Sequence, residues 1–181
     1  MEGVRLTISL IVAVMLQWTL RNVWEPFAYI DFPLIIVVFA ALQRNSIRAL
    51  IFGTVAGISM DALSGGLLGA NGFTKTLVAY IVSEIARRVY LDNLLLRIPV
   101  IAGACLLDDL VYYGLHKMFG QPPVADVLVT VSYSLIGTTV VGTLVYMFLQ
   151  NRTTEKVRRP RREIFASRRI RNRRNPIRLN K

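Results

Sequence analysis

Most of residues 1–150 fall into apolar segments that are separated by short, charged connectors. Of the 181 residues, 54% are hydrophobic and 18% are charged, which is less charge than a soluble domain of this length carries. About 20 apolar residues in a helix cross the hydrocarbon core of a bilayer. We therefore expect an all-α integral membrane domain over residues 1–150, with six transmembrane helices at residues 6–24, 27–42, 47–63, 73–86, 98–119 and 124–149.

The second segment, residues 27–42, is the shortest relative to a bilayer, and Asp31 and Pro33 lie near its start. Proline is tolerated in the first turn of a helix, where its missing N–H group would have no partner. The basic residues favour a full crossing, because it places Arg44 and Arg48 on the same side as the basic C-terminus. Positive charge marks the cytoplasmic side of a membrane protein. We therefore expect a bacterial inner membrane protein with both termini in the cytoplasm.

Small residues recur at intervals of four along the third segment and beyond it. In a helix this spacing forms one ridge with almost no side chains, which lets two helices approach closely. A second surface of this kind is expected in the last segment. The ridges predict helix packing or a partner interface, within the chain or between chains, and they contain Gly53, Gly57, Gly65, Gly69, Gly137 and Gly142.

Four ionisable residues inside the apolar segments are expected to form a buried polar network. Asp61 and Lys75 each lie 13 residues from a cytoplasmic arginine, so they are predicted to lie level and to form an ion pair. The alternative is that each reaches water or lipid headgroups separately. Asp108 and Asp109 lie near mid-membrane and point about 100° apart on a helix, so at most one of them can reach Lys75. They suit either a proton-relay site or a structural hydrogen-bonding pair.

The sequence lacks the residue patterns of the common enzyme classes. Cys105 is the only cysteine and His116 the only histidine, so no disulfide, metal cluster or cofactor is expected. No nucleophile, base and acid occur at catalytic spacing, and no glycine loop precedes a lysine as in phosphate-binding loops. We therefore expect a protein that is not an enzyme.

The C-terminal residues 151–181 form a basic tail. Residues 152–181 contain thirteen of the 22 Lys and Arg residues and two of the 11 acidic ones. Because the tail follows a membrane helix directly, it first meets anionic headgroups, and we favour these over a protein partner or nucleic acid. The expected lipid contacts are Arg158, Arg159, Arg161, Arg162, Arg168 and Arg169.

Three stretches make residues 5–150 similar to the bacterial rod shape-determining protein MreD family. They are DFPLIIVVFAAL at residues 31–42, the arginines Arg44 and Arg48, and GTVAGISMDALSGGLLGANGFTKTLVAY at residues 53–80. The resemblance implies a non-enzymatic scaffold subunit of the cell-elongation complex, which helps regulate peptidoglycan synthesis and rod cell shape. The implied partners are the bitopic protein MreC, RodA with its penicillin-binding transpeptidase, and MreB.

The resemblance also implies a fold similar to the S component of energy-coupling-factor transporters. That likeness supplies the alternative function, a substrate-binding subunit of a vitamin or small-molecule transporter. Such a subunit would need a closed cavity with convergent polar groups. A polar pocket around Asp61, Asn71 and Asp108 would therefore favour the transporter over the scaffold.

Overall fold

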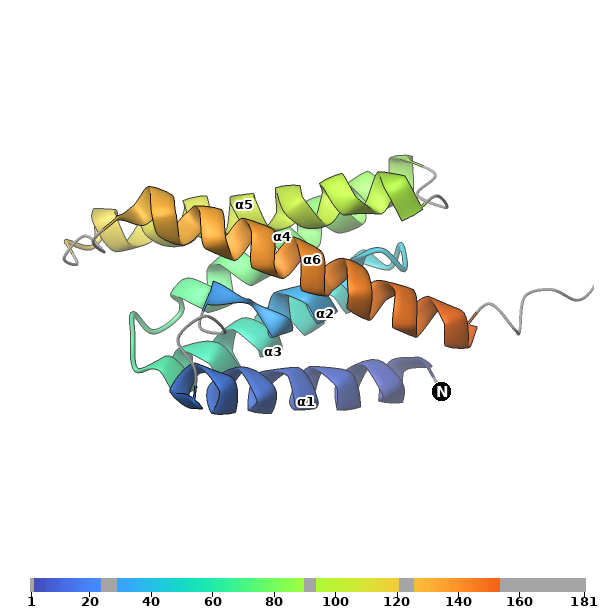
Figure 1. Cartoon of the computed structure of the whole chain (residues 1–181), viewed down its shortest axis with the longest axis horizontal. Helices are drawn as coiled ribbons and strands as arrows, with labels where there is room; N and C mark the ends of the chain where they lie inside the picture. The colour runs from blue at the N-terminus through green and yellow to red at the C-terminus, as the bar shows by residue number, and fades with distance from the viewer. Residues whose placement is uncertain (1, 24–28, 90–93, 121–125, 154–181) are drawn as a thin grey trace, which may run out of the picture. The chain divides into compact units, whose positions relative to one another are not determined.

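Helices make up the regular structure of the chain (Figure 1). The computed structural model describes residues 2–23, 29–89, 94–120 and 126–153, and over these ranges it contains helices and no strand. The chain divides into two compact units, Met1–Tyr146 and Met147–Lys181, and the packing described below lies within the first. The expected all-α class is confirmed, and the helices are α1 Glu2–Val23, α2 Phe32–Ala41, α3 Ser46–Ser64, α4 Ala70–Arg88, α5 Leu94–Met118 and α6 Val127–Thr153.

Four of the described helices, α1, α3, α5 and α6, are long and apolar enough to cross a membrane. The predicted six crossings are therefore only partly supported. Helix α2 has 10 residues, or ~15 Å of helix, which is about half the thickness of the hydrocarbon core. Helix α4 has 19 residues but includes Lys75, Glu84, Arg87 and Arg88.

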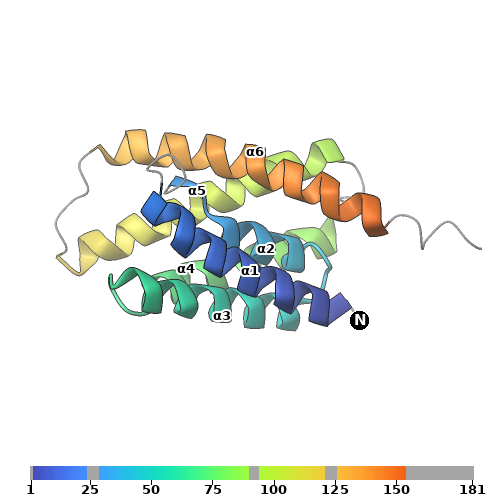
Figure 2. The same ribbon diagram turned by 60° about the horizontal axis from the view of Figure 1, so that its bottom comes forward.

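Helix α2 lies at the centre of the first unit, between α1 and α3 on one side and α4 and α5 on the other (Figures 1 and 2). It is apolar on all sides, as expected for a helix that is surrounded by protein. Leu34, Val37 and Ala40 are each at most 1% exposed. The side chain of Asp31 caps the helix by accepting a hydrogen bond from the Leu34 amide at 2.8 Å. Pro33 lies in the first turn, as predicted.

Helices α3 and α4 form a closely packed antiparallel hairpin. A Cβ atom on Gly53 would lie 2.7 Å from the Lys75 carbonyl oxygen, and one on Gly57 would lie 2.2 Å from the Asn71 carbonyl oxygen. Both distances are shorter than any contact that a real side chain could make. The glycine ridge of α3 is therefore used inside the chain, against the backbone of α4.

The ridge does not continue to Gly65 and Gly69, so the prediction that these two glycines pack helices is wrong. Helix α3 ends at Ser64, and the four-residue spacing has no geometric meaning beyond it. Both glycines have positive φ, 64° and 91°, and a Cβ on either would meet no described atom within 4 Å. They are present because the backbone there takes the left-handed conformation that other residues disfavour.

Helix α6 packs on α2 and α5 through one buried face. Ser134, Thr138 and Gly142 recur on it at intervals of four. A Cβ on Gly137 would lie 3.0 Å from the Ile30 side chain, and one on Gly142 would lie 3.1 Å from the Ile101 side chain. The small-residue surface of the last segment therefore also contacts the same chain.

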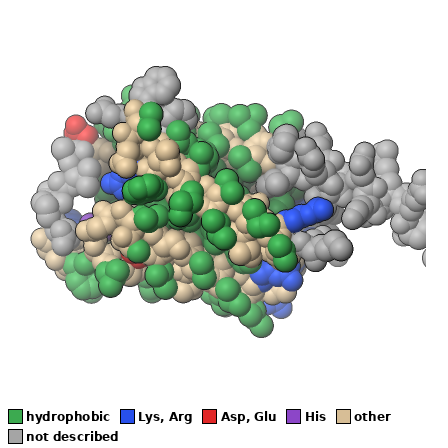
Figure 3. Space-filling model, turned by 90° about the horizontal axis from the view of Figure 1, so that it is seen from below, with side chains coloured by type: hydrophobic (Ala, Val, Ile, Leu, Met, Phe, Trp, Pro, Cys, Tyr) green, Lys and Arg blue, Asp and Glu red, His purple; other side chains and the backbone are tan. Residues whose placement is uncertain are grey.

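The outward faces of the helices are apolar. On α1, Ile8, Ile11, Val12 and Met15 are each more than half exposed. Hydrophobic side chains are spread along the face that contains α1, and most of the Lys and Arg side chains visible there lie toward one end (Figure 3). This distribution matches a helix bundle whose sides face lipid and whose end faces water.

Candidate functional site

Three charged residues from three elements meet in the interior of the first unit. The Lys75 cluster comprises Lys75 on α4, Asp108 on α5 and Asp31 at the start of α2. The Lys75 ammonium lies 2.9 Å from Asp108 Oδ2, and it also forms an ion pair with Asp31 Oδ2. The Lys75 side chain is fully buried, and that of Asp108 is 7% exposed. The prediction that one of the paired aspartates reaches Lys75 is confirmed for Asp108.

The Lys75 cluster joins three helices and has more negative than positive groups. With both carboxyl groups ionised, the two aspartates and one lysine carry a net charge of −1. Asp108 Oδ1 is buried and has no hydrogen-bond partner, while Asp108 Oδ2 is bonded to the lysine. Since a buried charge is strongly unfavourable without a partner, the cluster is a site where one substitution has large consequences.

The predicted ion pair between Asp61 and Lys75 is wrong, because the glycines set a different helix register. Gly57 faces Asn71 and Gly72, whereas Gly53 faces residues 75–79. This register places Asp61 beside residues 69–72, which precede Lys75 by three to six residues, or ~5–9 Å of helix. Counting 13 residues from Arg48 and from Arg88 had placed the two residues at the same level.

Asp61 instead caps the start of α4. The Asp61 cap consists of Asp61, Gly69, Asn71 and Gly72. Asp61 Oδ1 accepts hydrogen bonds from the backbone and side-chain nitrogens of Asn71, at 3.0 and 2.9 Å. Asp61 Oδ2 accepts from the backbone amides of Gly69 and Gly72, at 2.9 and 3.0 Å. A carboxylate has about four acceptor sites, so these four bonds use all of them.

Replacing Asp61 with Ala is expected to loosen the first turn of α4. Three backbone N–H groups would lose their acceptor, and one of them, that of Gly72, is buried, where an unsatisfied group costs about 1–3 kcal/mol. Asp61→Asn retains one acceptor oxygen and should destabilise the protein less. The rate of hydrogen exchange at the amides of residues 69–72 measures the effect. Exchange as slow as in the wild type would contradict the role of the Asp61 cap.

Asp109 does not join the Lys75 cluster, so its predicted place in one network with Lys75 and Asp61 is wrong. Successive residues of a helix point about 100° apart. Asp108 therefore points toward α4, whereas Asp109 lies near the thiol of Cys105, with Sγ 3.9 Å from Asp109 Oδ2. Cys105 in turn lies 3.5 Å from the Ser134 hydroxyl of α6. Asp109 therefore belongs to the contact between α5 and α6.

Asp31 was not predicted to be part of the polar network. The sequence does indicate its role as a helix N-cap, because an aspartate two residues before a proline is typical of that position. The backbone of this turn is also held by other helices. The amide of Asp31 donates to the Thr138 hydroxyl at 3.1 Å, and the amide of Phe32 donates to Gln17 Oε1 at 3.0 Å.

Glu84 forms ion pairs, at 3.6 and 3.1 Å, with Arg87 and Arg88, which lie three and four residues further along the same helix. The arginines expected to bind lipid lie outside the described residues; they are Arg158, Arg159, Arg161, Arg162, Arg168 and Arg169. Over the residues that are described, no group of three or more His, Cys, Asp or Glu side chains could hold a metal ion.

Comparison with known proteins gives one match. A family model described as rod shape-determining protein MreD matches residues 3–153 of the chain. No curated protein and no solved structure matches it. The matched range includes every helix described above and both buried polar sites.

Proposed function

We propose that this chain, which belongs to the MreD family of rod shape-determining proteins, is a non-enzymatic scaffold subunit of the cell-elongation complex. The family acts in rod shape determination. In the proposed role the chain binds a bitopic MreC-like protein in the bacterial inner membrane. Through that protein it helps to regulate peptidoglycan synthesis by RodA and its penicillin-binding transpeptidase. MreB filaments are a further proposed partner on the cytoplasmic side.

The observation that carries this proposal is the internal use of the buried polar groups. Asp61 accepts four hydrogen bonds, all from N–H groups of its own chain. Lys75 is bonded to Asp31 and Asp108. A carrier of small polar molecules needs such groups to converge on a cavity. In this chain they hold helices together and leave apolar faces on the outside, which suits a protein that binds other membrane helices.

The glycine contacts narrow the choice of partner surface. Gly53 and Gly57 are occupied by α4, and Gly142 is occupied by α5. A single-span partner must therefore pack on an outward face of the bundle, where van der Waals packing rather than hydrophobicity drives association. Exposed apolar residues are present on such faces of α1, α3, α5 and α6, for example Ile11, Val55, Leu110 and Ile136.

The proposed orientation has both termini in the cytoplasm. The connector between α2 and α3 carries Arg44, and the end of α4 carries Arg87 and Arg88. The chain alternates direction from helix to helix, so these residues lie at the end of the bundle that also contains its N-terminus. The positive-inside rule then assigns this end to the cytoplasm.

Native mass spectrometry of the full chain, extracted gently from its own membranes, tests the scaffold function. We expect a bitopic periplasmic protein or a wall synthase to remain bound. Retention of a stoichiometric small molecule, or of a coupling protein with ATPases, would contradict the scaffold and support the transporter subunit.

Photo-crosslinking from single positions tests the partner surface in intact cells. We expect crosslinks to the bitopic protein from at least one outward position among Ile11, Val55, Leu110 and Ile136. Ala56 is a matched control, because it neighbours Val55 on α3 and is fully buried, whereas Val55 is 50% exposed. Absence of crosslinks from all four outward positions would contradict direct binding along these helices.

A further inference from the structure

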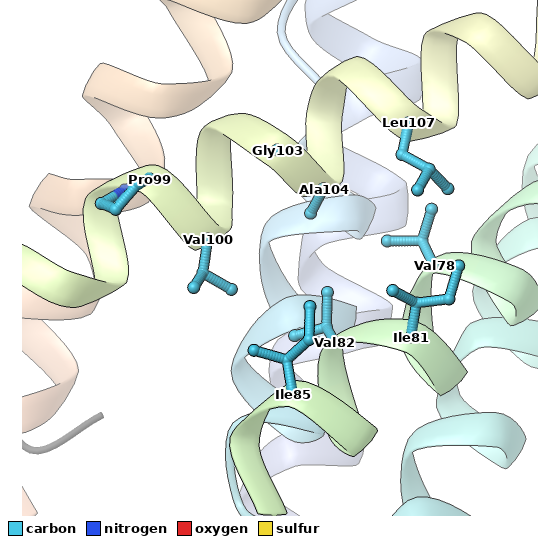
Figure 4. Close-up of a pocket in the computed structure, with 9 residues that line it drawn as sticks. All are labelled: Val78, Ile81, Val82, Ile85, Pro99, Val100, Gly103, Ala104 and Leu107. Carbon is cyan, nitrogen blue, oxygen red and sulfur yellow. The ribbon is translucent and has the colours of Figure 1, made fainter. Parts of the chain in front are cut away.

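An apolar groove lies between α4 and α5, and its lining includes no residue of the Lys75 cluster or of the Asp61 cap (Figure 4). Its volume is about 340 Å³. Val82 and Ala104 are buried in it, and a Cβ on Gly103 would meet no described atom within 4 Å. The close-up shows the side chains of the two helices facing one another across this space. The lining residues are Val78, Ile81, Val82, Ile85, Pro99, Val100, Gly103, Ala104 and Leu107.

The groove ends beside a group of arginines. It follows α4 from Val78 to Ile85, which is ~11 Å of helix. Arg87 and Arg88 follow Ile85 within one turn, and their side chains are 57% and 77% exposed. On α5, Arg97 precedes Pro99 at the same end, and its guanidinium lies 4.4 Å from the centre of the Tyr146 ring. The apolar groove thus ends beside exposed, positively charged side chains.

The groove is apolar and ends at exposed cations, which is the pattern that fits an acyl chain with an anionic headgroup. A helix with its side chains is about 10–12 Å across, so ~11 Å of it occupies roughly 860 Å³. The empty space in the groove is about 670 Å³, so a helix would not fit fully inside it. A single acyl chain is narrow enough to enter it. Glu84 neutralises one of the two neighbouring arginines, which leaves a net positive charge for an anionic group at the mouth.

We infer that this groove is a binding site for an anionic phospholipid of the leaflet that surrounds Arg88. One acyl chain lies between α4 and α5, over Gly103. The headgroup phosphate pairs with Arg88 and Arg87 at the end of α4. The site selects lipids by charge, because each basic residue near the surface attracts an anionic headgroup. Salt screens this attraction and so weakens the preference. The inference is independent of the bitopic partner in the proposed function.

Filling the groove tests the acyl-chain site. The full-length protein, in nanodiscs or by native mass spectrometry, is titrated with phosphatidylglycerol and with phosphatidylcholine. Gly103→Phe is expected to weaken phosphatidylglycerol binding about tenfold, since each excluded methylene removes part of the apolar contact. Gly114→Phe is the matched control, because Gly114 lies on the same helix with equally open space and outside the groove. It should bind phosphatidylglycerol as the wild type does.

Removing the charge tests the headgroup site. Arg88→Gln is expected to lower the preference for phosphatidylglycerol over phosphatidylcholine about fivefold. Unchanged binding in folded Gly103→Phe, or equal binding of the two lipids by the wild type, would overturn the inference. If Gly103→Phe releases the bitopic protein and keeps its lipid, the groove is a protein interface, which also overturns the inference. Loss of lipid with the bitopic protein still bound separates this site from the scaffold function.

Discussion

Replacing Lys75 with Met is expected to lower the free energy of unfolding by about 3–5 kcal/mol, because it leaves the buried Asp108 carboxylate and the partly exposed Asp31 carboxylate without their cation. The Lys75 side chain is fully buried, and both of its partners come from other elements. Reversible unfolding of the purified full-length protein in mild detergent measures the change.

A triple variant distinguishes loss of the ion pairs from loss of packing. Asp31→Asn with Lys75→Met and Asp108→Asn removes all three charges, and Asn retains the cap on α2. This variant should be more stable than Lys75→Met alone. Glu84→Gln is the surface control, because its pairs are exposed and worth about 1 kcal/mol or less. If Lys75→Met were as mild as Glu84→Gln, the Lys75 cluster would have no structural role.

Replacing Gly57 with Ala is the second large expected effect. The new Cβ would lie 2.2 Å from the Asn71 carbonyl oxygen and 2.5 Å from the Gly72 Cα, so α3 and α4 must move apart. Overpacking of this kind costs about 1–3 kcal/mol, and it rises where the obstructing atoms belong to backbone. The separation would also strain the Asp61 cap, one turn further along α3. The unfolding assay used for Lys75→Met measures the change in the free energy of unfolding that Gly57→Ala causes.

Two other glycines provide matched controls for Gly57→Ala. Gly114→Ala adds a methyl group where no described atom lies within 4 Å, and should stabilise its helix by about 0.5–1 kcal/mol. Gly65→Ala meets no atom either, but it places a side chain at a φ of 64° and should cost about 1–2 kcal/mol. A loss at Gly57 no larger than at Gly65 would contradict close packing of the hairpin.

The sequence predicts the helices because apolar length and charged connectors are local signals. The bounds of α3 differ from the prediction by one residue at each end. The same signals do not distinguish a helix surrounded by lipid from one surrounded by protein, and four of the six predicted crossings have the length and apolarity of a membrane span. Helix α2 is apolar because other helices surround it, and α4 carries Lys75 because its counterions come from α2 and α5.

The candidate site was less predictable, because it depends on register and on distant partners. The residues Asp61, Lys75 and Asp108 were identified as buried and polar, since charge is rare in apolar segments. The contact of one paired aspartate with Lys75 was also predicted, but the partners of Asp61 were not, because a one-turn change in register exchanges every neighbour between two helices. Gly53 and Gly57 set that register by contact with backbone atoms, and nothing in the spacing of the charges shows it.

The positions of the two counterions of Lys75 along the chain also set an order of events during synthesis. Asp31 precedes Lys75 by 44 residues, and Asp108 follows it by 33. At about 5–20 residues per second, Lys75 exists for roughly 2–7 seconds before Asp108 is made. During that interval Asp31 is the only member of the pair available to neutralise it. The aspartate that caps a short central helix is thus the first counterion that the chain supplies for Lys75.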